Sequence, residues 1–99
     1  MKSFEEKVLE KCKLIPKGKV STYKGLAKAV NSVGYRAVGQ VLKKNKYPIK
    51  IPCHRVVNSD GSVGNYSGPG KKKGKVFLLR KEGVEIKEGR IDLKKYLFK

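Results

Sequence analysis

The segment Pro52-Cys53-His54 carries the residues best suited to chemistry, because it joins the one histidine of the chain to one of its two cysteines. Proline fixes its own φ and restricts the residue before it, so Cys53 is expected to point in one direction. A cysteine attacks as its thiolate, which a neighbouring base and a positive field favour. His54 could supply that base. A core cysteine beside an incidental histidine explains the bare pair at least as well.

The charge of the chain is strongly positive and unevenly distributed. Lys and Arg number 25 against 8 Asp and Glu in 99 residues, which gives a net charge of +17. No acid lies between Glu10 and Asp60, so one face of the fold is expected to be basic. Such a face binds polyanions, most simply nucleic acid, although heat-adapted proteins also carry lysine-rich surfaces.

Several classes of protein are disfavoured by composition. The apolar runs are far shorter than the ~20 residues that cross a bilayer, and the first residues lack the apolar segment of a secretory signal. The chain has two cysteines and one histidine, and their spacing is not that of metal ligands, so we expect no metal site. Cys12 lies on an apolar helical stripe and is interpreted as a small core residue. We expect no cofactor, no membrane partner, and a cytoplasmic monomer with access to the nucleoid or nucleus.

Helical periodicity and capping signals predict a mostly helical domain. Ser3-Phe4-Glu5-Glu6 reads as a capping box opening a helix that ends before Pro16, and a later helix is expected over Lys72–Lys81 with Gly83 just past its end. Between them, Ser21 or Thr22 caps a second helix, and a third runs from about Tyr35 to Lys44. Two short helices, the second basic outside, form a helix-turn-helix pattern, which is weak on its own.

The residues after Asn45 no longer follow a helical spacing of apolar residues. Alternation over 47–51 and the run Arg55-Val56-Val57 read as short strands, and the glycine-rich stretch 64–70 reads as a loop or wing. The tail from Val84 is interpreted as a short strand and a small packing segment. The predicted fold is therefore mostly α with a small β wing, a winged helix-turn-helix-like DNA-binding domain.

The string PCHRV at 52–56, followed by GNYSG at 64–68 and EG at 82–83, resembles the C-terminal active-site domain of the O6-alkylguanine-DNA alkyltransferases. IPKGKVSTY at 15–23 and RAVG at 36–39 extend the resemblance from about Phe4 to Gly83. The family's N-terminal domain has no counterpart in these residues. We expect one domain over 1–99, with the helix-turn-helix at about 21–45 and the active-site strand and loop at 48–70.

The resemblance implies a catalytic group of four residues. Cys53 corresponds to the sulfur that accepts the alkyl group, and His54 to the base that deprotonates it through a bound water. Glu82 corresponds to the carboxylate that orients the imidazole. Tyr23 corresponds to the tyrosine that donates a proton or hydrogen bond to the flipped guanine, which otherwise cannot be reached inside the duplex.

The resemblance also implies binding residues. The carbonyls of Cys53 and Val56 would accept from the exocyclic amine of guanine, and Asn45 would tie the third helix to the Cys53 segment. Arg36 would fill the space left by the flipped nucleotide, and Gly39 would permit close approach to DNA. The remaining candidates are the loop residues Tyr66, Ser67 and Gly68, which would close over the purine, and Ala37, Gln40, Lys43 and Lys44 on the DNA-facing helix.

The function favoured by these residues is single-turnover repair of double-stranded DNA, as a methylated-DNA–protein-cysteine methyltransferase acting on O6-alkylguanine. O4-alkylthymine is a further candidate substrate, and a loop about two residues longer than usual at 69–73 bears on the size of alkyl group accepted. A non-catalytic lesion-binding protein of the alkyltransferase-like type is the alternative. A winged-helix transcription factor would leave Cys53, His54 and Glu82 without a role.

Overall fold

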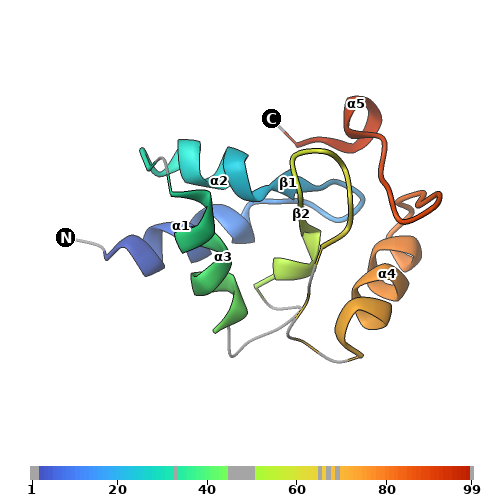
Figure 1. The fold of residues 1–99 in the computed structure, drawn as a ribbon, viewed down its shortest axis with the longest axis horizontal. Coiled ribbons are helices and arrows are strands. Elements are labelled where there is room, and N and C mark those ends of the chain that lie inside the picture. Colours follow the sequence, from blue (N-terminus) through green and yellow to red (C-terminus); the bar gives the residue numbers. More distant parts are fainter. Residues whose placement is uncertain are drawn as a thin grey trace.

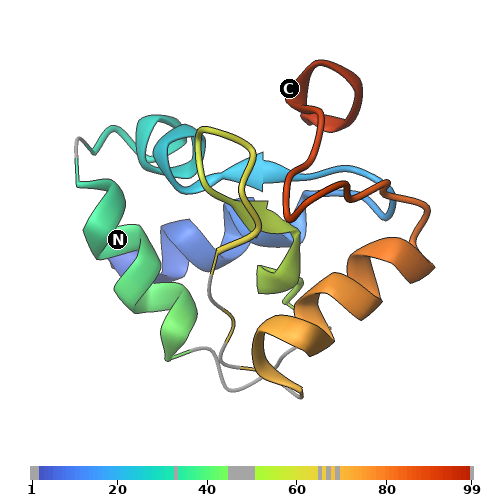
Figure 2. The same ribbon diagram turned by 45° about the vertical axis from the view of Figure 1, so that its right-hand side comes forward.

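The computed structural model describes residues 3–32, 34–44, 51–64, 66, 68 and 70–98. The helices of residues 4–43 gather at one side of the molecule, the helices of the C-terminal part lie at the other, and a short sheet runs between them (Figures 1 and 2). The elements are α1 (Phe4–Lys13), β1 (Ser21–Thr22), α2 (Tyr23–Ala29), α3 (Tyr35–Lys43), the 3-10 turn η1 (Cys53–Arg55), β2 (Val56–Val57), α4 (Lys71–Lys81) and α5 (Leu93–Tyr96). Within the described ranges, no helix is long and apolar enough to cross a membrane.

Helix α1 begins where its capping box predicts. Ser3 Oγ accepts from the Glu6 backbone N–H at 3.1 Å, and the Glu6 carboxylate accepts from the Ser3 N–H at 3.4 Å. The two bonds satisfy donors that a helix start otherwise leaves unpaired. Val8 and Cys12 lie on the inner face and are both fully buried. The predicted apolar stripe and the buried, structural place of Cys12 are thus confirmed.

Helices α2 and α3 form the predicted helix pair. Thr22 is the N-cap of α2 and accepts from the Gly25 N–H at 2.9 Å. In α3 the side chains of Val38 and Leu42 are buried against α1 and α2. The opposite face of α3 is exposed to solvent and carries Arg36, Ala37, Gln40, Lys43 and Lys44.

The sheet is a short parallel pair, with Ser21 opposite Val56 and Thr22 opposite Val57. This pairing places the start of α2 beside the segment that follows Cys53. A mostly helical fold with a small β element, as predicted, is therefore confirmed. Arg55 was expected in the strand but belongs to η1, because its N–H closes a turn onto the Pro52 carbonyl at 2.9 Å. Residues 45–50 of the other predicted strand lie outside the described ranges.

Two apolar clusters hold the fold together. One joins α1, α2 and α3 to Cys53, Val56 and Tyr66, and the other packs α4 and the C-terminal segment around Val57. The tail differs from its prediction, since it contains the short helix α5 rather than a strand. Its end is tied to the N-terminal half because the Phe98 N–H donates to the Val20 carbonyl at 2.8 Å.

Candidate active site

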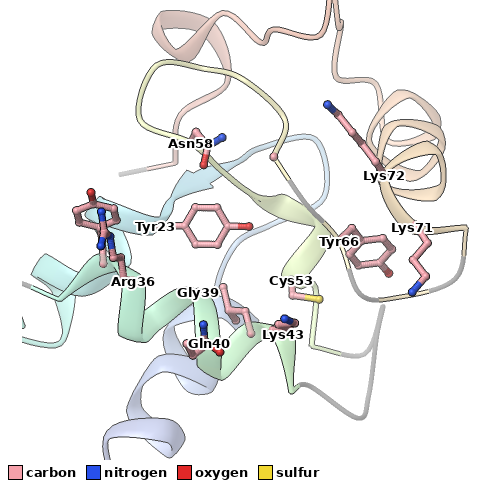
Figure 3. A pocket seen from close by; sticks show the side chains of 13 residues that line it. Tyr23, Arg36, Gly39, Gln40, Lys43, Cys53, Asn58, Tyr66, Lys71 and Lys72 are labelled. Carbon is pink, nitrogen blue, oxygen red and sulfur yellow. The ribbon is translucent and has the colours of Figure 1, made fainter.

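A pocket of about 700 Å³ opens between α3 and the start of α4 (Figure 3). Cys53 lies in its wall, and the side chains of Tyr23 and Tyr66 approach from α2 and from the glycine-rich loop. Arg36, Gly39, Gln40 and Lys43 border it from α3. The pocket thus gathers seven of the residues chosen from sequence, although they are spread from α2 to the loop before α4.

Cys53 is held at the first position of η1 and is 6% exposed. Pro52 precedes it with φ −77° and ψ 65°, and the Cys53 N–H donates to the Ile51 carbonyl at 2.7 Å. The rigid entry expected from proline is therefore present. The Cys53 residue is nearly buried, yet it forms part of the pocket wall. A group that reacts with a ligand bound in the pocket must lie in such a place.

His54 is fully buried and points away from solvent toward α4. Its Nε2 lies 3.1 Å from Oε2 of Glu82, which caps the C-terminal end of α4. A carboxylate only accepts, so Nε2 carries the proton and Nδ1 keeps the lone pair. Nδ1 is buried and makes no hydrogen bond within the described part of the chain. Burial lowers the His54 pKa more than the Glu82 contact raises it, which keeps the ring neutral and able to take a proton.

Arg55 fixes the carboxylate from the other side. Its Nε and Nη2 donate to the two Glu82 oxygens at 2.9 and 2.6 Å, and Nη1 donates to the Ile15 carbonyl at 2.8 Å. Burial alone would raise the pKa of Glu82, but the hydrogen bonds from Arg55 and His54 outweigh it and the pKa is lowered. Glu82 therefore stays ionised and fixed in orientation.

Two of the tyrosines that line the pocket, Tyr23 and Tyr66, keep their protons. Burial, with a smaller effect of the Cys53 charge, raises the pKa of Tyr23 to about 12. The same causes raise the pKa of Tyr66, whose hydroxyl is buried and makes no hydrogen bond in the described residues. Both tyrosines therefore stay protonated at neutral pH, and their hydroxyls remain hydrogen-bond donors.

Gly68 is needed for the position of Tyr66. A Cβ at residue 68 would collide with the Tyr66 ring and its hydroxyl, so only glycine allows this close approach. Gly39 differs, because a Cβ there would meet nothing within 4 Å. Its small size is thus not required by packing within the protein, which leaves room for a partner to approach α3.

The remaining predicted residues lie beside the pocket or outside the described ranges. Val56 is buried in β2, and its carbonyl accepts from Nζ of Lys75 at 2.7 Å. Ala37 and Lys44 are on the exposed face of α3 and do not line the pocket. Asn45 and Ser67 lie outside the residues that the structure describes.

Sequence reasoning missed several residues of the site. Tyr35, Asn58, Lys71 and Lys72 also line the pocket, and Arg55 and Lys75 support it from behind. Lys75 carried a signal that was not used: it lies four residues before the buried Leu79, on the same helical face. The sequence contains no comparable signal for Arg55, because its partner Glu82 is distant in sequence.

The fold joins a helix-turn-helix with a basic outer face to a pocket that holds a thiol beside a histidine–carboxylate pair. This arrangement is that of a helix-turn-helix DNA-binding domain with a cysteine in the wall of its pocket. Residues 3–84 match the family described as 6-O-methylguanine DNA methyltransferase, DNA-binding domain. The chain belongs to this family.

Individual relatives agree with that assignment. The chain is 52% identical over 84 residues to a methylated-DNA–protein-cysteine methyltransferase of Thermococcus kodakarensis, which covers 83% of this chain and 45% of that protein. It is 47% identical over 85 residues to a bifunctional methyltransferase/endonuclease of Picrophilus torridus, covering 85% of this chain and 28% of the other. The chain therefore spans less than half the length of these two relatives.

Two solved structures are also similar. Schizosaccharomyces pombe Atl1, in complex with damaged DNA containing O6-carboxymethylguanine, superposes with a TM-score of 0.87 at 33% identity, over 100% of this chain and 99% of that one. Mycobacterium tuberculosis OGT in complex with DNA superposes with a TM-score of 0.77 at 31% identity, over 84% of this chain and 50% of the other. The two neighbours share the helical fold and its small sheet.

Proposed function

We propose that this protein repairs alkylated DNA by transferring the alkyl group from O6 of guanine to the sulfur of Cys53. The observation that carries the proposal is the place of Cys53, in the wall of the pocket and directly before the buried His54–Glu82 pair. Because a thioether does not hydrolyse, the protein would act once and remain alkylated. In this proposal the described chain is a single domain combining DNA binding and alkyl transfer.

The first step is loss of the Cys53 proton. His54 Nδ1 takes it, directly or through one water, and Glu82 stabilises the imidazolium that forms. The neutral resting state of His54 and the ionised state of Glu82, both described above, are the states this step requires. The resulting thiolate attacks the alkyl carbon, and the sulfur–carbon bond forms as the bond from carbon to O6 breaks.

The departing guanine takes the electron pair of the broken bond. Tyr23 would donate a hydrogen bond or proton to the purine and so neutralise the developing charge. Its high pKa keeps that proton in place until the base is bound. The carbonyls of Cys53 and Val56 would accept from the exocyclic amine, and the segment Tyr66 to Gly68, including Ser67, would cover the base.

Recognition of DNA is assigned to the exposed face of α3. The alkylated nucleotide would be turned out of the duplex into the pocket, with Arg36 in the space that it leaves. Lys43 and Lys44 would contact phosphates, and Asn45 would link α3 to the Cys53 segment. The DNA complexes of Atl1 and of OGT support binding through this fold. We place the protein in the cytoplasm with access to DNA, as a monomer.

A second function has its own support. Atl1 matches this chain along nearly its whole length, and its structure holds a DNA lesion. A protein that binds alkylated DNA without accepting the alkyl group would use the same pocket. In that case Cys53 would be a pocket-lining residue and not an acceptor.

Mass spectrometry of the Cys53 peptide separates the two functions. After incubation with duplex DNA containing O6-methylguanine, a repair protein carries one added methyl on Cys53, and Cys53→Ser carries none while still binding the duplex. Cys12→Ser serves as the matched control and should transfer normally. Tight lesion binding with unmodified Cys53 in the unaltered protein would overturn alkyl transfer and support lesion binding alone.

A further inference from the structure

The C-terminal segment, residues 86–98, lies beyond the part of the chain that matches the family, which ends at residue 84. It is packed into the fold all the same, because Ile86 and Ile91 are buried in the apolar cluster of α4. The superposition on Atl1 covers 100% of this chain and so includes the segment. None of the site residues chosen from sequence lies in it, yet its backbone is bonded to two elements that line the pocket.

The first of these elements is the turn 58–62, whose first residue lines the pocket. The Ile91 N–H donates to the Gly61 carbonyl at 2.9 Å, and the Val63 N–H donates to the Gly89 carbonyl at 3.1 Å. The two bonds join the segment to the turn in an antiparallel arrangement. The backbone of the turn is therefore attached directly to the C-terminal segment.

The turn is also closed by hydrogen bonds of its own. The Asn58 N–H donates to the Ser62 carbonyl at 2.9 Å, and the Asn58 side-chain amide donates to Ser62 Oγ at 2.9 Å. The Asp60 carboxylate accepts from the Ser62 N–H at 2.9 Å. A turn closed in this way is placed as a unit, so its attachment at Gly61 also fixes Asn58 in the pocket wall.

The second element is the entry to α2. The Val20 N–H donates to the Tyr96 carbonyl at 2.9 Å, and the Val20 carbonyl accepts from the Phe98 N–H at 2.8 Å. Val20 directly precedes β1, which leads into α2, and Tyr23 is the first residue of that helix. Tyr23 lines the same pocket as the turn. The segment thus returns from the end of α4 to β1 and joins the two elements (Figures 1 and 2).

We propose that the C-terminal segment is a positioning element of the pocket, which holds Asn58 through Gly61 and Tyr23 through Val20. This role rests on the proposed function, in which the pocket receives the alkylated base. Undamaged duplex is assigned to the exposed face of α3, a helix that packs on α1 and α2. The segment should therefore govern selectivity for the lesion and leave general affinity for DNA unchanged.

Phe98→Pro tests the attachment at Val20, because proline has no N–H to donate to that carbonyl. Leu97 is extended, with ψ 125°, as the residue before a proline prefers. Phe98→Ala is the matched control, since it also removes the ring but keeps the N–H. Both are made in Cys53→Ser, so that no alkyl transfer consumes the complex. Fluorescence anisotropy then measures affinity for an O6-methylguanine duplex and for the same duplex with guanine.

A loosened entry to α2 must be ordered again when the lesion binds. We therefore expect Phe98→Pro to weaken binding of the lesion duplex by the factor that one hydrogen bond is worth, about 3- to 10-fold. Its affinity for the undamaged duplex should be unchanged, and Phe98→Ala should keep both affinities. Equal selectivity for the lesion in folded Phe98→Pro and in Phe98→Ala would overturn the proposal.

Gly61→Ala tests the attachment of the turn and decides if Phe98→Pro does not fold. A Cβ at Gly61 would lie 2.6 Å from the Ile91 carbonyl oxygen, so the turn must move away from the segment. Gly89→Ala is the control, because its φ is also positive but its Cβ would meet none of the described atoms within 4 Å. Gly61→Ala alone should lose selectivity for the lesion, and equal selectivity in the two variants would overturn the role.

Hydrogen exchange gives a measurement without DNA, which decides if the unaltered protein does not distinguish the two duplexes. The Gly25 N–H donates to Thr22 Oγ1 at the start of α2 and reports on the order of that entry. It should exchange faster in Phe98→Pro than in Phe98→Ala, and equal rates would overturn the proposal. Failure of alkyl transfer appears separately, as an unmodified Cys53 peptide in the unaltered protein.

Discussion

The carboxylate of Glu82 lies 3.1 Å from Nε2 of His54, across 28 positions of sequence. It fixes which nitrogen of the ring carries the proton and leaves Nδ1 as the basic atom. Arg55 holds the same carboxylate with two hydrogen bonds. The orientation of His54 therefore depends on a residue at the far end of α4.

We predict that Glu82→Gln slows methyl transfer to Cys53 about 10- to 100-fold while DNA binding changes little. Glutamine keeps the size of the side chain but cannot stabilise the imidazolium. The rate is measured by single-turnover transfer from O6-methylguanine DNA. Glu85→Gln is the control, because Glu85 is exposed and pairs only with Lys87 among the ion pairs described. Equal rates for the two variants would remove Glu82 from the mechanism.

Stability is predicted to fall on acidification in two stages. The His54 pKa is lowered in the fold, so the unfolded chain binds more protons once the pH falls below the ordinary value of 6.5, and stability declines. The lowered pKa of Glu82 adds a second decline as the pH falls below 4.5. Urea unfolding at constant salt across this range measures both. In Glu82→Gln the second stage should shrink, and an unchanged profile would contradict the prediction.

The fold could be predicted from sequence because its helices carry local signals. The Ser3–Glu6 capping box, the Thr22 N-cap and the spacing of Val38 and Leu42 act within one or two turns, and each gave an element close to the observed one. The β2 strand was placed one residue too early at Arg55. A turn closed by Pro52 is a local feature as well, but its geometry is not evident from residue types.

The site was less predictable because its support comes from long-range contacts. Cys53 and His54 are adjacent in sequence, so the sequence alone suggested both as candidates, whereas Glu82 was assigned only through family resemblance. Arg55 and Lys75 were missed because a charged residue is normally exposed. Lys75 is fully buried and Arg55 is partly buried because the fold places Lys75 against the Val56 carbonyl and Arg55 against Glu82.

The two cysteines are predicted to differ sharply in reactivity. Cys12 is fully buried, and burial, with a smaller effect of the charge at Cys53, raises its pKa to about 12. Only about one molecule in 10⁵ carries a Cys12 thiolate at neutral pH. Iodoacetamide should modify the Cys53 peptide and leave the Cys12 peptide unmodified until urea unfolds the chain. Modification of Cys12 in the folded protein would show that α1 opens readily.

Gly68→Ala is predicted to lower both stability and transfer. The added Cβ would collide with the Tyr66 ring, which must then leave its buried position. We expect a loss of about 1–3 kcal/mol in the free energy of unfolding, as for overpacking elsewhere. Gly34→Ala is the matched control because its Cβ would make only ordinary contacts. Equal unfolding curves for the two variants would mean that Tyr66 is not held as described.

Gly39→Ala is predicted to change stability and DNA affinity in opposite directions. Nothing lies within 4 Å of a Cβ at this position, and alanine favours a helix interior by about 0.5–1 kcal/mol, so α3 should gain stability. If the DNA backbone approaches α3 at Gly39, the same methyl group would weaken binding. Urea unfolding and fluorescence anisotropy with a labelled duplex measure the two effects. Higher stability with unchanged affinity would mean that DNA does not approach α3 at this position.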